Sequence, residues 1–486
     1  MNRKRLKIFL LAFSITAASF SIEASQVVTQ DSLKGKAFDV VIAGGTPGGL
    51  ATAIRASREG LSVLLVNHTA HIGGMLTNGL GVLDTEYYRA RSPIYDEMCA
   101  RLVSHYEGKT FDEDSFERFD VGERLYYEPH VIENILNEMV AVEEISILLD
   151  HYPARIIKDG TTIESVRFQH MDDGFSVLVR GRYFVDAMYE ADLAALAGVP
   201  YRVGRESRAE YGEPHAGVSF THLVDSEERP EAIKDLRVHV FRLSSREIPH
   251  PQNGEGDNAI QAYNFRLALS RDPVNRYIPP KPDNYDPEVY QIIKERLRSL
   301  PKAEGRFGWK VTGWNTPILP GGNHDYPNAS WPERKKIAQR HLDWAIGILH
   351  YLQRDLPEPV WGLAKDEFVD NNYAPYEMYV REARRIKGLK VFTELDGVLS
   401  KDFDRAPIQA DSIAITEWAL DSHACTTDRF QNSRPEGKVL LAEETVPGQV
   451  DFKTLISEEA TNLVVPVCLS TTHIGWGTIR LEPTWM

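Results

Sequence analysis

Hydrophobic and polar positions in the first part of the chain follow the pattern of a β-α-β unit. Residues 38–43 and 61–66 form largely apolar runs, which are typical of strands buried on both faces. The stretch 50–59 between them is rich in small residues and predicts a helix that Gly60 ends. The pattern therefore indicates a parallel sheet.

Further along, the pattern predicts a helix from Pro129 to about Val142 and strands at 145–149, 163–169, 175–179 and 183–187. Prolines and aromatic residues become frequent from about residue 216, where amphipathic helices are expected at 285–299 and 331–353. Buried-strand character returns at 463–467. We therefore predict an α/β fold: a Rossmann-like domain with a β-α-β dinucleotide unit, made of residues 37–215 and 431–486, into which an α+β substrate domain is inserted at 216–430.

The first 24 residues have the composition of an export signal. Four basic residues between Arg3 and Lys7 precede an uncharged apolar run from Ile8 to Phe20, and Ala24 offers a cleavage point. The apolar run is shorter than the roughly 20 residues that span a bilayer. We expect cleavage near residue 24 and a periplasmic or secreted protein with no stable membrane association; an uncleaved anchor is the alternative.

The composition of the chain limits the kinds of molecule that it is expected to bind. The formal net charge of −15 argues against nucleic acid and anionic membranes as partners. The partner that we expect is a small-molecule substrate. The three cysteines, Cys99, Cys425 and Cys468, form no CxxC pair, and a Cys425–Cys468 disulfide is one arrangement that their number allows. The oligomeric state cannot be inferred from these features.

The strongest chemical signal is the glycine-rich turn that follows the first strand. Gly44, Gly45, Gly48 and Gly49 surround Thr46 in a strand-turn-helix context, where glycines permit a tight turn and close approach to a pyrophosphate at the helix N-terminus. Thr46 replaces the middle glycine, and its hydroxyl is a candidate phosphate ligand. Asn67 ends the second strand, where an acidic residue usually binds the ribose.

A second glycine pair, Gly73 and Gly74, follows the second strand and leads into Met75 and Thr77. A nicotinamide-only unit does not need this segment, whereas a flavin must be covered along its length. The two glycine-rich segments together favour FAD as the cofactor.

Several stretches together make the chain resemble a known family, the FAD-dependent oxidoreductases whose members are sometimes labelled xanthan lyase. The similarity runs from about Phe38 to Met486 and rests on the segments 44–49, 71–79, 127–130, 185–193, 261–266, 379–385, 421–423 and 466–473. The resemblance implies non-covalent FAD and an inserted substrate domain, but no particular substrate.

The resemblance also implies roles for single residues. The four glycines of the first turn would cradle the pyrophosphate, Asn67 would face the ribose, and Gly74, Met75 and Thr77 would lie along the flavin. The strand near Ala154 would touch the adenine, Ala187 and Asp192 would close the site, and Arg480 would lie near the flavin. The family pattern continues past Met486 into a glycine- and alanine-rich helix, so we expect a fragment or an incomplete flavin end.

Candidate catalytic residues come from the second half. His473, in a Ser/Thr-rich segment beside glycines, is the best candidate for moving a proton, although a structural histidine would look the same. His423, which follows a run of residues that looks helix-like, is a second candidate, with a buried core or cap residue as the alternative. Arg381 could orient an anionic or hydroxyl-rich substrate, but Arg381, Arg384 and Arg385 could equally form a solvated helix face.

No metal site is predicted; the segment 321–326, with one histidine and one aspartate, is interpreted as a loop. The function favoured is an exported FAD-dependent oxidoreductase that transfers hydride between FAD and a small organic substrate, with carbohydrate derivatives among the candidates. The alternatives are a carbohydrate-acting lyase or binding protein that retains FAD only structurally, and a degenerate fold without catalysis.

Overall fold

The computed structural model describes residues 26–83, 92–109, 125–226, 241–291, 307–355, 361–401, 403–416 and 418–479. The predicted signal peptide, the end of the helix expected at 285–299, and Arg480 lie outside these residues. None of the described helices is both long and apolar enough to cross a membrane.

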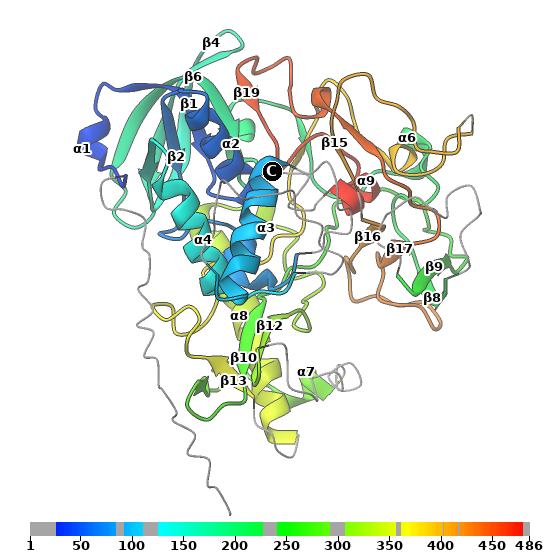
Figure 1. The fold of residues 1–486 in the computed structure, drawn as a ribbon. Coiled ribbons are helices and arrows are strands. Elements are labelled where there is room, and N and C mark those ends of the chain that lie inside the picture. Colours follow the sequence, from blue (N-terminus) through cyan, green and yellow to red (C-terminus); the bar gives the residue numbers. More distant parts are fainter. Residues whose placement is uncertain are drawn as a thin grey trace, which may run out of the picture.

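A seven-stranded sheet organises the first part of the fold (Figure 1). Its strand order is β3-β2-β1-β6-β5-β4, and β19 also pairs with β6. The strands are β1 (Ala37–Ala43), β2 (Val63–Val66), β3 (Ile145–Leu148), β4 (His151–Asp159), β5 (Thr162–His170), β6 (Ser176–Asp186) and β19 (Leu463–Val464). An α/β fold with a parallel sheet and a β-α-β unit is thus confirmed.

The register of the parallel strands brings their carboxyl ends together. Ala43 of β1 lies opposite Val66 of β2 on one side and Asp186 of β6 on the other. Val66 in turn lies opposite Leu148 of β3. Ligands of open α/β sheets bind outside this edge, so a site is expected beside the residues that follow β1, β2, β3 and β6.

The strands predicted at 175–179 and 183–187 are one continuous strand, β6. Its first half pairs antiparallel with β5, and its second half pairs parallel with β19, where Leu463 lies opposite Phe184. The apolar run expected at 463–467 is a strand over only two residues, because the N–H of Val465 donates to the carbonyl oxygen of Leu455 outside the sheet.

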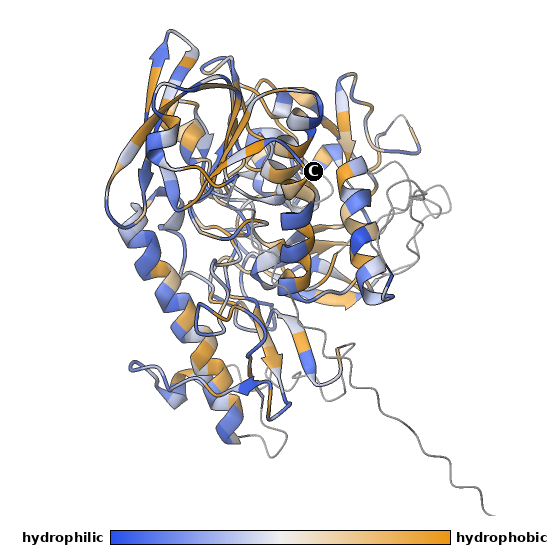
Figure 2. Ribbon diagram, turned by 60° about the vertical axis from the view of Figure 1, so that its left-hand side comes forward, coloured by the Kyte–Doolittle hydropathy of each residue, from blue (hydrophilic) through white to orange (hydrophobic). Residues whose placement is uncertain are grey.

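Helices cover this sheet and pack against one another. α2 (Pro47–Arg58) contacts β1, β2 and β3, while α3 (Pro93–Tyr106) and α4 (Pro129–Ala141) pack together and against α2. Figure 2 shows hydrophobic residues along the strands and alternating hydrophobic and hydrophilic residues along the helices. Val41, Ile42, Leu64 and Leu65 are fully buried, which places the main core between the sheet and these helices.

The middle of the chain forms a second region with its own sheet, of order β11-β13-β10-β12. Near it lie the helix α8 and the short helix α7, which pack against each other (Figure 1). These elements are β10 (Leu267–Ser270), β11 (Arg276–Tyr277), β12 (Lys310–Trp314), β13 (Gly362–Ala364), α7 (Pro287–Gln291) and α8 (Trp331–Asp355). The helix predicted at 331–353 is therefore present.

Short elements complete the described chain. Two-stranded pairs join β14 to β7, β15 to β18, β16 to β17 and β8 to β9. The remaining elements are α1 (Gln30–Leu33), η1 (Leu76–Leu80), α5 (Asp192–Leu196), β7 (Tyr201–Arg202), α6 (Arg208–Tyr211), β8 (Thr221–Asp225), β9 (Leu243–Glu247), η4 (Tyr326–Asn328), β14 (Arg385–Ile386), η5 (Glu394–Asp396), β15 (Ser412–Ile415), β16 (Leu420–Ser422), β17 (Val439–Leu441), β18 (Gln449–Asp451), η6 (Phe452–Thr454) and α9 (His473–Ile479). The domain boundaries at 215–216 and 430–431 stay predictions.

Candidate functional site

The glycine-rich turn connects β1 to α2 at the carboxyl edge of the sheet. Gly44 has φ +107°, and a Cβ added there would lie 2.6 Å from the carbonyl carbon of Ala187. A Cβ added at Gly49 would lie 1.9 Å from the carbonyl oxygen of Gly44. Both positions therefore exclude any side chain, and the N-terminus of α2 approaches the strands as a dinucleotide turn requires.

Thr46 is the N-cap of α2. Its hydroxyl donates to the carbonyl oxygen of Ala187 at 2.7 Å and accepts from the N–H of Gly49 at 3.3 Å, while Pro47 begins the helix. The hydroxyl that the sequence suggested as a phosphate ligand is thus engaged within the protein, where it fixes the helix start to the end of β6.

Asn67 follows β2, as predicted, and its amide joins two loops. Its Oδ1 accepts from the N–H of Gly45 at 2.9 Å, and its Nδ2 donates to the carbonyl oxygen of His71 at 2.6 Å. Asn67 therefore holds the glycine-rich turn beside the segment that follows β2, and its contact with a ribose stays a prediction.

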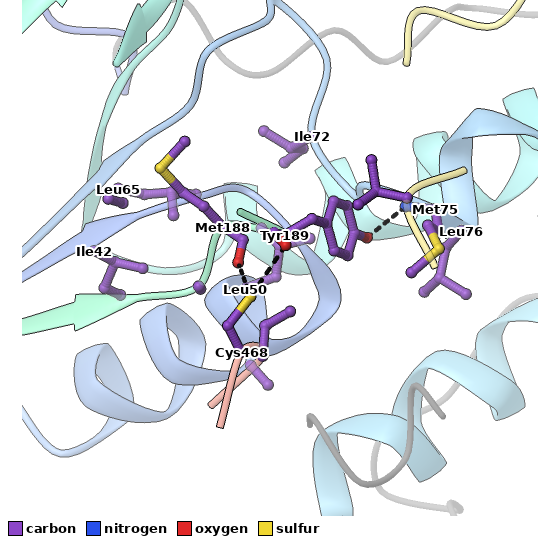
Figure 3. Close-up of a cluster of buried hydrophobic side chains, with 14 of the residues drawn as sticks. Ile42, Leu50, Leu65, Ile72, Met75, Leu76, Met188, Tyr189 and Cys468 are labelled. Atoms are coloured by element: carbon purple, nitrogen blue, oxygen red, sulfur yellow. Dashed lines mark hydrogen bonds between the residues drawn. The ribbon is translucent and has the colours of Figure 1, made fainter. Parts of the chain in front are cut away.

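The second glycine pair packs directly against the first turn. The N–H of Gly73 donates to the carbonyl oxygen of Gly45 at 2.7 Å, and Thr77 closes its own loop by donating to Ile72. The N–H of Met75 donates to the Tyr189 hydroxyl at 2.7 Å (Figure 3). The two glycine-rich segments, which are separate in the sequence, thus lie side by side in the fold.

Cys468 reaches the same region from near the end of the chain. Its Sγ lies 3.0 Å from the carbonyl oxygen of Tyr189 and 3.4 Å from that of Met188 (Figure 3). Cys425 lies elsewhere, with its Sγ 3.7 Å from the carbonyl oxygen of His423. Both thiols are buried and free, so the hypothesis of a Cys425–Cys468 disulfide is wrong.

Asp192 opens α5 just after β6 and is held by two arginines. Arg334 binds both of its carboxylate oxygens at 2.5 and 2.8 Å, and Arg384 binds one at 2.6 Å. Burial opposes ionisation, but the two guanidinium groups keep the pKa of Asp192 below its usual range. Asp192 thus joins α5 to α8 and to the segment around residue 384, and its place at the edge of the FAD site stays a prediction.

A pocket of about 590 Å³ opens beyond the carboxyl ends of β2 and β3. Its walls come from the loop after β2, the turns at Asp150 and Met171, the segment after β6, and α8; the lining includes His68, His71, Tyr189, Glu190, Trp331, Arg334, Asp370, Tyr376 and Glu377. Ala154 lies at a register shift of β4 between Pro153 and Arg155. The pocket occupies the position at which open α/β sheets bind ligands.

The candidate catalytic residues meet in a separate buried cluster around Glu382. His473, the first residue of α9, places its Nδ1 3.0 Å from Glu382 Oε1 and its Nε2 3.0 Å from the Ser422 hydroxyl. Its backbone N–H donates to Glu206 at 2.8 Å. All four side chains are buried, so the imidazole is held at both ring nitrogens.

His423 belongs to the same cluster. Its N–H donates to Gln261 Oε1 at 2.9 Å, and the N–H of Gln261 donates to Glu382 at 3.0 Å. His423 follows the strand β16 rather than the helix-like run that the sequence suggested. Burial, followed by the nearby positive charge of Arg381, lowers the pKa of His423 well below its usual value, so this imidazole is neutral.

Arg381 is buried beside these residues. Its Nε donates to the carbonyl oxygen of Ala262 at 3.0 Å, its Nη2 donates to Asn315 at 3.0 Å, and its guanidinium lies 4.7 Å from the centre of the Tyr379 ring. Arg384 and Arg385 are buried as well, and the segment is not helical. The alternative of a solvated helix face is therefore wrong.

Glu382 is the residue at the centre of the cluster that sequence reasoning did not single out. Burial opposes its ionisation, but His473 and then Arg385 lower its pKa to about 2. Arg385 also binds Glu206 at 2.9 Å and so holds two carboxylates beside one histidine. The only available signal was that Glu382, Ser422 and Gln261 all lie within the stretches that carry the family resemblance.

Among the residues that the structure describes, two groups of potential metal ligands lie outside both regions. Glu128, His130 and Glu367 form one, where Lys310 Nζ already lies 2.8 Å from Glu367 Oε1 and supplies the positive charge. His215, Glu394 and Glu444 form the other. Neither includes the segment 321–326, which is a loop leading into η4.

The family model of the FAD dependent oxidoreductases matches residues 39–486. The chain belongs to this family. It is therefore an FAD-dependent oxidoreductase, and FAD is its cofactor. No curated protein shows significant similarity to the chain.

Solved structures of flavoenzymes share limited similarity with this FAD-dependent oxidoreductase. THI4 of Thermovibrio ammonificans is 16% identical over 36% of this chain and 69% of its own, with a TM-score of 0.27. The myxobacterial chondrochloren halogenase CndH is 15% identical over 48% of this chain and 49% of its own, with a TM-score of 0.25. The flavin-dependent monooxygenase PieE, solved with FAD and substrate, is 17% identical over 39% and 35%, with a TM-score of 0.24. The chain thus spans about half or less of the last two proteins.

The residues of the oxidoreductase fit FAD. Gly44 and Gly49 leave no room for side chains at the turn where a pyrophosphate would meet the N-terminus of α2. In the adjoining pocket, His68 Nδ1 and Glu190 Oε2 are buried polar atoms without a hydrogen-bond partner among the described residues. Bound FAD would supply a flavin ring that takes up or releases two electrons.

Proposed function

We propose that this FAD-dependent oxidoreductase transfers a hydride between FAD and a small organic substrate, with carbohydrate derivatives among the candidates, and that His473 moves the accompanying proton. The observation that carries the proposal is the cluster around Glu382. It unites the segments 261–266, 379–385, 421–423 and 466–473, which come from distant parts of the sequence.

The contacts of His473 suit proton transfer. Glu382 lies at one ring nitrogen and orients the imidazole, while the Ser422 hydroxyl lies at the other and can exchange a proton with it. In our proposal Arg381 and His423 both contact the substrate. Arg381 orients it through its guanidinium, and His423 contacts it as a neutral imidazole.

The test uses the full-length protein loaded with FAD. Its visible absorption spectrum reports bound flavin, and bleaching under anaerobic conditions reports reduction by candidate substrates. His473→Ala is expected to retain FAD but to slow reduction by about 100-fold or more, the usual contribution of a positioned acid or base. The control His350→Ala changes a half-buried histidine on α8 and should leave the rate unchanged.

Three outcomes would contradict the proposal. An unchanged reduction rate in His473→Ala would return this histidine to a structural role. Bound FAD that no substrate reduces, together with cleavage of a carbohydrate, would favour the lyase alternative. A purified protein that takes up no FAD would favour the degenerate fold.

We also propose that the protein is exported. The basic cluster and the apolar run within residues 1–24 support export, because they have the composition of a signal peptide. N-terminal sequencing of protein recovered outside the cytoplasm should begin close to Ser25, whereas an intact Met1 would support the anchor alternative.

A further inference from the structure

Arg266 is a buried cation that has no acidic partner among the described residues. It is 8% exposed, its Nε is fully buried, and its guanidinium makes no hydrogen bond or ion pair with any residue that the structure describes. The guanidinium lies 4.3 Å from the centre of the Tyr379 ring. An aromatic ring attracts a cation but does not neutralise it, and burying an unpaired charge is costly. The charge of Arg266 therefore indicates that an anion binds beside it.

A second buried guanidinium lies at the same tyrosine ring. Arg381 is 2% exposed and stands 4.7 Å from the centre of the Tyr379 ring. Its hydrogen bonds to Ala262 and Asn315 go to uncharged oxygens. Two buried cations at one ring repel each other unless an anion lies near both of them. The guanidinium fork of arginine matches a carboxylate or a phosphate, so the pair favours a ligand with one of these groups.

Asn264 adds a hydrogen-bond acceptor to this site. It is fully buried, and its Nδ2 donates at 3.0 Å to Asn315 Oδ1, the oxygen that also accepts from Arg381. Its Oδ1 has no partner in the part of the chain that the structure describes. Buried amide oxygens are nearly always hydrogen-bonded, so this oxygen indicates a donor on the ligand. An anion for Arg266 and a donor for Asn264 together describe a ligand that carries a hydroxyl group as well as an acidic group.

The charge of the neighbouring residue decides between the two acidic groups. Glu382 follows Arg381 directly, and its low pKa keeps it negatively charged. A nearby negative charge opposes a second one, and opposes two more strongly. A singly charged carboxylate therefore suits the site better than a doubly charged phosphate.

The site borders both of the regions described above. A Cβ added at Gly79 of η1 would lie 2.0 Å from the carbonyl oxygen of Arg266, so Arg266 packs against the segment expected along the flavin. The indole N–H of Trp476 in α9 donates to the carbonyl oxygen of Arg381 at 2.6 Å, and α9 begins with His473. A ligand held by the two arginines is thus close to both groups that the proposed reaction needs.

We propose that the substrate is a hydroxycarboxylic acid, such as a sugar acid, whose carboxylate binds to Arg266 and Arg381 while a hydroxyl group donates to Asn264 Oδ1. This inference rests on the proposed function and names the substrate class for it. The oxidation balances with FAD alone, because one C–OH group gives up a hydride to FAD and a proton to His473 and becomes a carbonyl group. Uncharged carbohydrates are disfavoured as substrates.

Thermal unfolding of the full-length, FAD-loaded protein measures binding without relying on turnover. The probes are lactate, which is a small hydroxycarboxylate, and D-glucuronate, which is a sugar acid. Lactamide and D-glucuronamide are the matched control ligands, because they keep the shape and the hydroxyl groups but carry no charge. We expect each acid to raise the unfolding midpoint of the wild type, and its amide to have no effect at the same concentration.

Substitutions assign this binding to the two-arginine site. Arg266→Met keeps an apolar side chain beside Tyr379 and removes the unpaired charge, so its unfolding midpoint without ligand should equal or exceed that of the wild type. Its affinity for lactate should fall by about 30-fold or more, the usual loss when one partner of a buried charge pair is removed. Arg266→Lys keeps the charge without the fork and should lose less affinity. Arg271→Met is the matched control, because Arg271 directly follows β10 and lies 4.3 Å from the Trp309 ring; it should bind lactate like the wild type.

Equal stabilisation by each acid and its amide would overturn the inference. Unchanged lactate affinity in folded Arg266→Met would do the same, as would tighter binding of inorganic phosphate than of either acid. These results are distinct from failure of the proposed function. Lactate binding that requires Arg266, in a protein whose flavin no hydroxycarboxylate reduces, would contradict hydride transfer and support the anion site. Reduction of the flavin by an uncharged sugar, at the same rate in Arg266→Met, would support hydride transfer and refute the substrate class.

Discussion

Glu213 shows how burial changes the chemistry of a single carboxyl group. It is fully buried, and its Oε1 accepts from the Thr472 hydroxyl at 2.6 Å and from the N–H of Glu394 at 2.7 Å. Oε2 has no partner among the described residues. Burial raises the pKa of Glu213 from 4.5 to about 7, so the folded protein holds this proton under conditions in which the unfolded chain releases it.

This difference predicts a pH dependence of stability. The raised pKa means that the contribution of Glu213 is complete below about pH 4.5 and is lost as the pH rises to about 7. Glu213→Gln keeps an acceptor for both donors and cannot ionise. At pH 8 we expect it to increase the free energy of unfolding by on the order of 2 to 3 kcal/mol relative to the wild type.

Urea denaturation at pH 5 and pH 8 checks this prediction, with the exposed Glu164→Gln as control. The gain should appear at pH 8 and be small at pH 5. An equal effect of Glu213→Gln at both pH values would mean that Glu213 titrates normally.

Thr46 and Asn67 illustrate what residue types alone can predict. Their positions at the turn and at the end of β2 followed from the sequence pattern. Their hydrogen bonds did not, because Thr46 bonds to Ala187 and Asn67 bonds to Gly45, and these contacts join segments that the chain separates by up to 141 residues. A polar side chain indicates a donor or acceptor without indicating its partner.

At the scale of elements, α8 is fastened to α5 through one buried ion pair. Arg334 is 2% exposed and binds Asp192 through Nη1 and Nη2, so removing it leaves a buried carboxylate with Arg384 as its remaining cation. Breaking a buried pair by removing one partner typically destabilises a protein by about 3 to 5 kcal/mol.

We therefore expect Arg334→Leu to lower the free energy of unfolding by about 3 kcal/mol or more. Lys335→Leu, the next residue along the same helix, removes only an exposed pair with Asp172 and should change it by less than about 1 kcal/mol. Chemical denaturation of the two variants makes the comparison. Similar losses in both would show that α8 is not anchored by Arg334.

Elements with a strong pattern of their own were predictable, and those that depend on neighbours were not. β1, α2, α4 and α8 follow apolar spacing and local start signals, and they appear close to their expected bounds. β16 was expected to be helix-like, but it pairs with β17, where Asp421 lies opposite Leu440. Short strands take their structure from a partner strand, which local propensity does not encode.

At the scale of the whole molecule, the proposed FAD site draws on many segments at once. The turn after β1, the loop after β2, the end of β6 and α8 all border the proposed cofactor region. A ligand that binds only the folded state stabilises every segment that it needs. FAD should therefore raise the unfolding midpoint of the described regions together, in one transition.

We expect FAD at 100 times its dissociation constant to add about 2.7 kcal/mol of stability, which scanning calorimetry detects as a shift of the whole transition. NAD at the same concentration is the control and should produce no shift. A shift with NAD equal to that with FAD would contradict the cofactor assignment, and movement of only one of two resolved transitions would contradict the shared site.

The sequence by itself determined the features that local chemistry encodes. Glycines at positions 44 and 49, the apolar run of β1 and the small residues of α2 are sufficient for a dinucleotide turn, because steric limits on the backbone act over a few residues. Tertiary structure decided the rest. Glu382, Ser422 and His473 meet only because the chain returns to one place from three distant segments. Cys425 and Cys468 are both free thiols, because the fold places them in different surroundings. Such contacts depend on the packing of distant elements against one another, which no short stretch of sequence encodes.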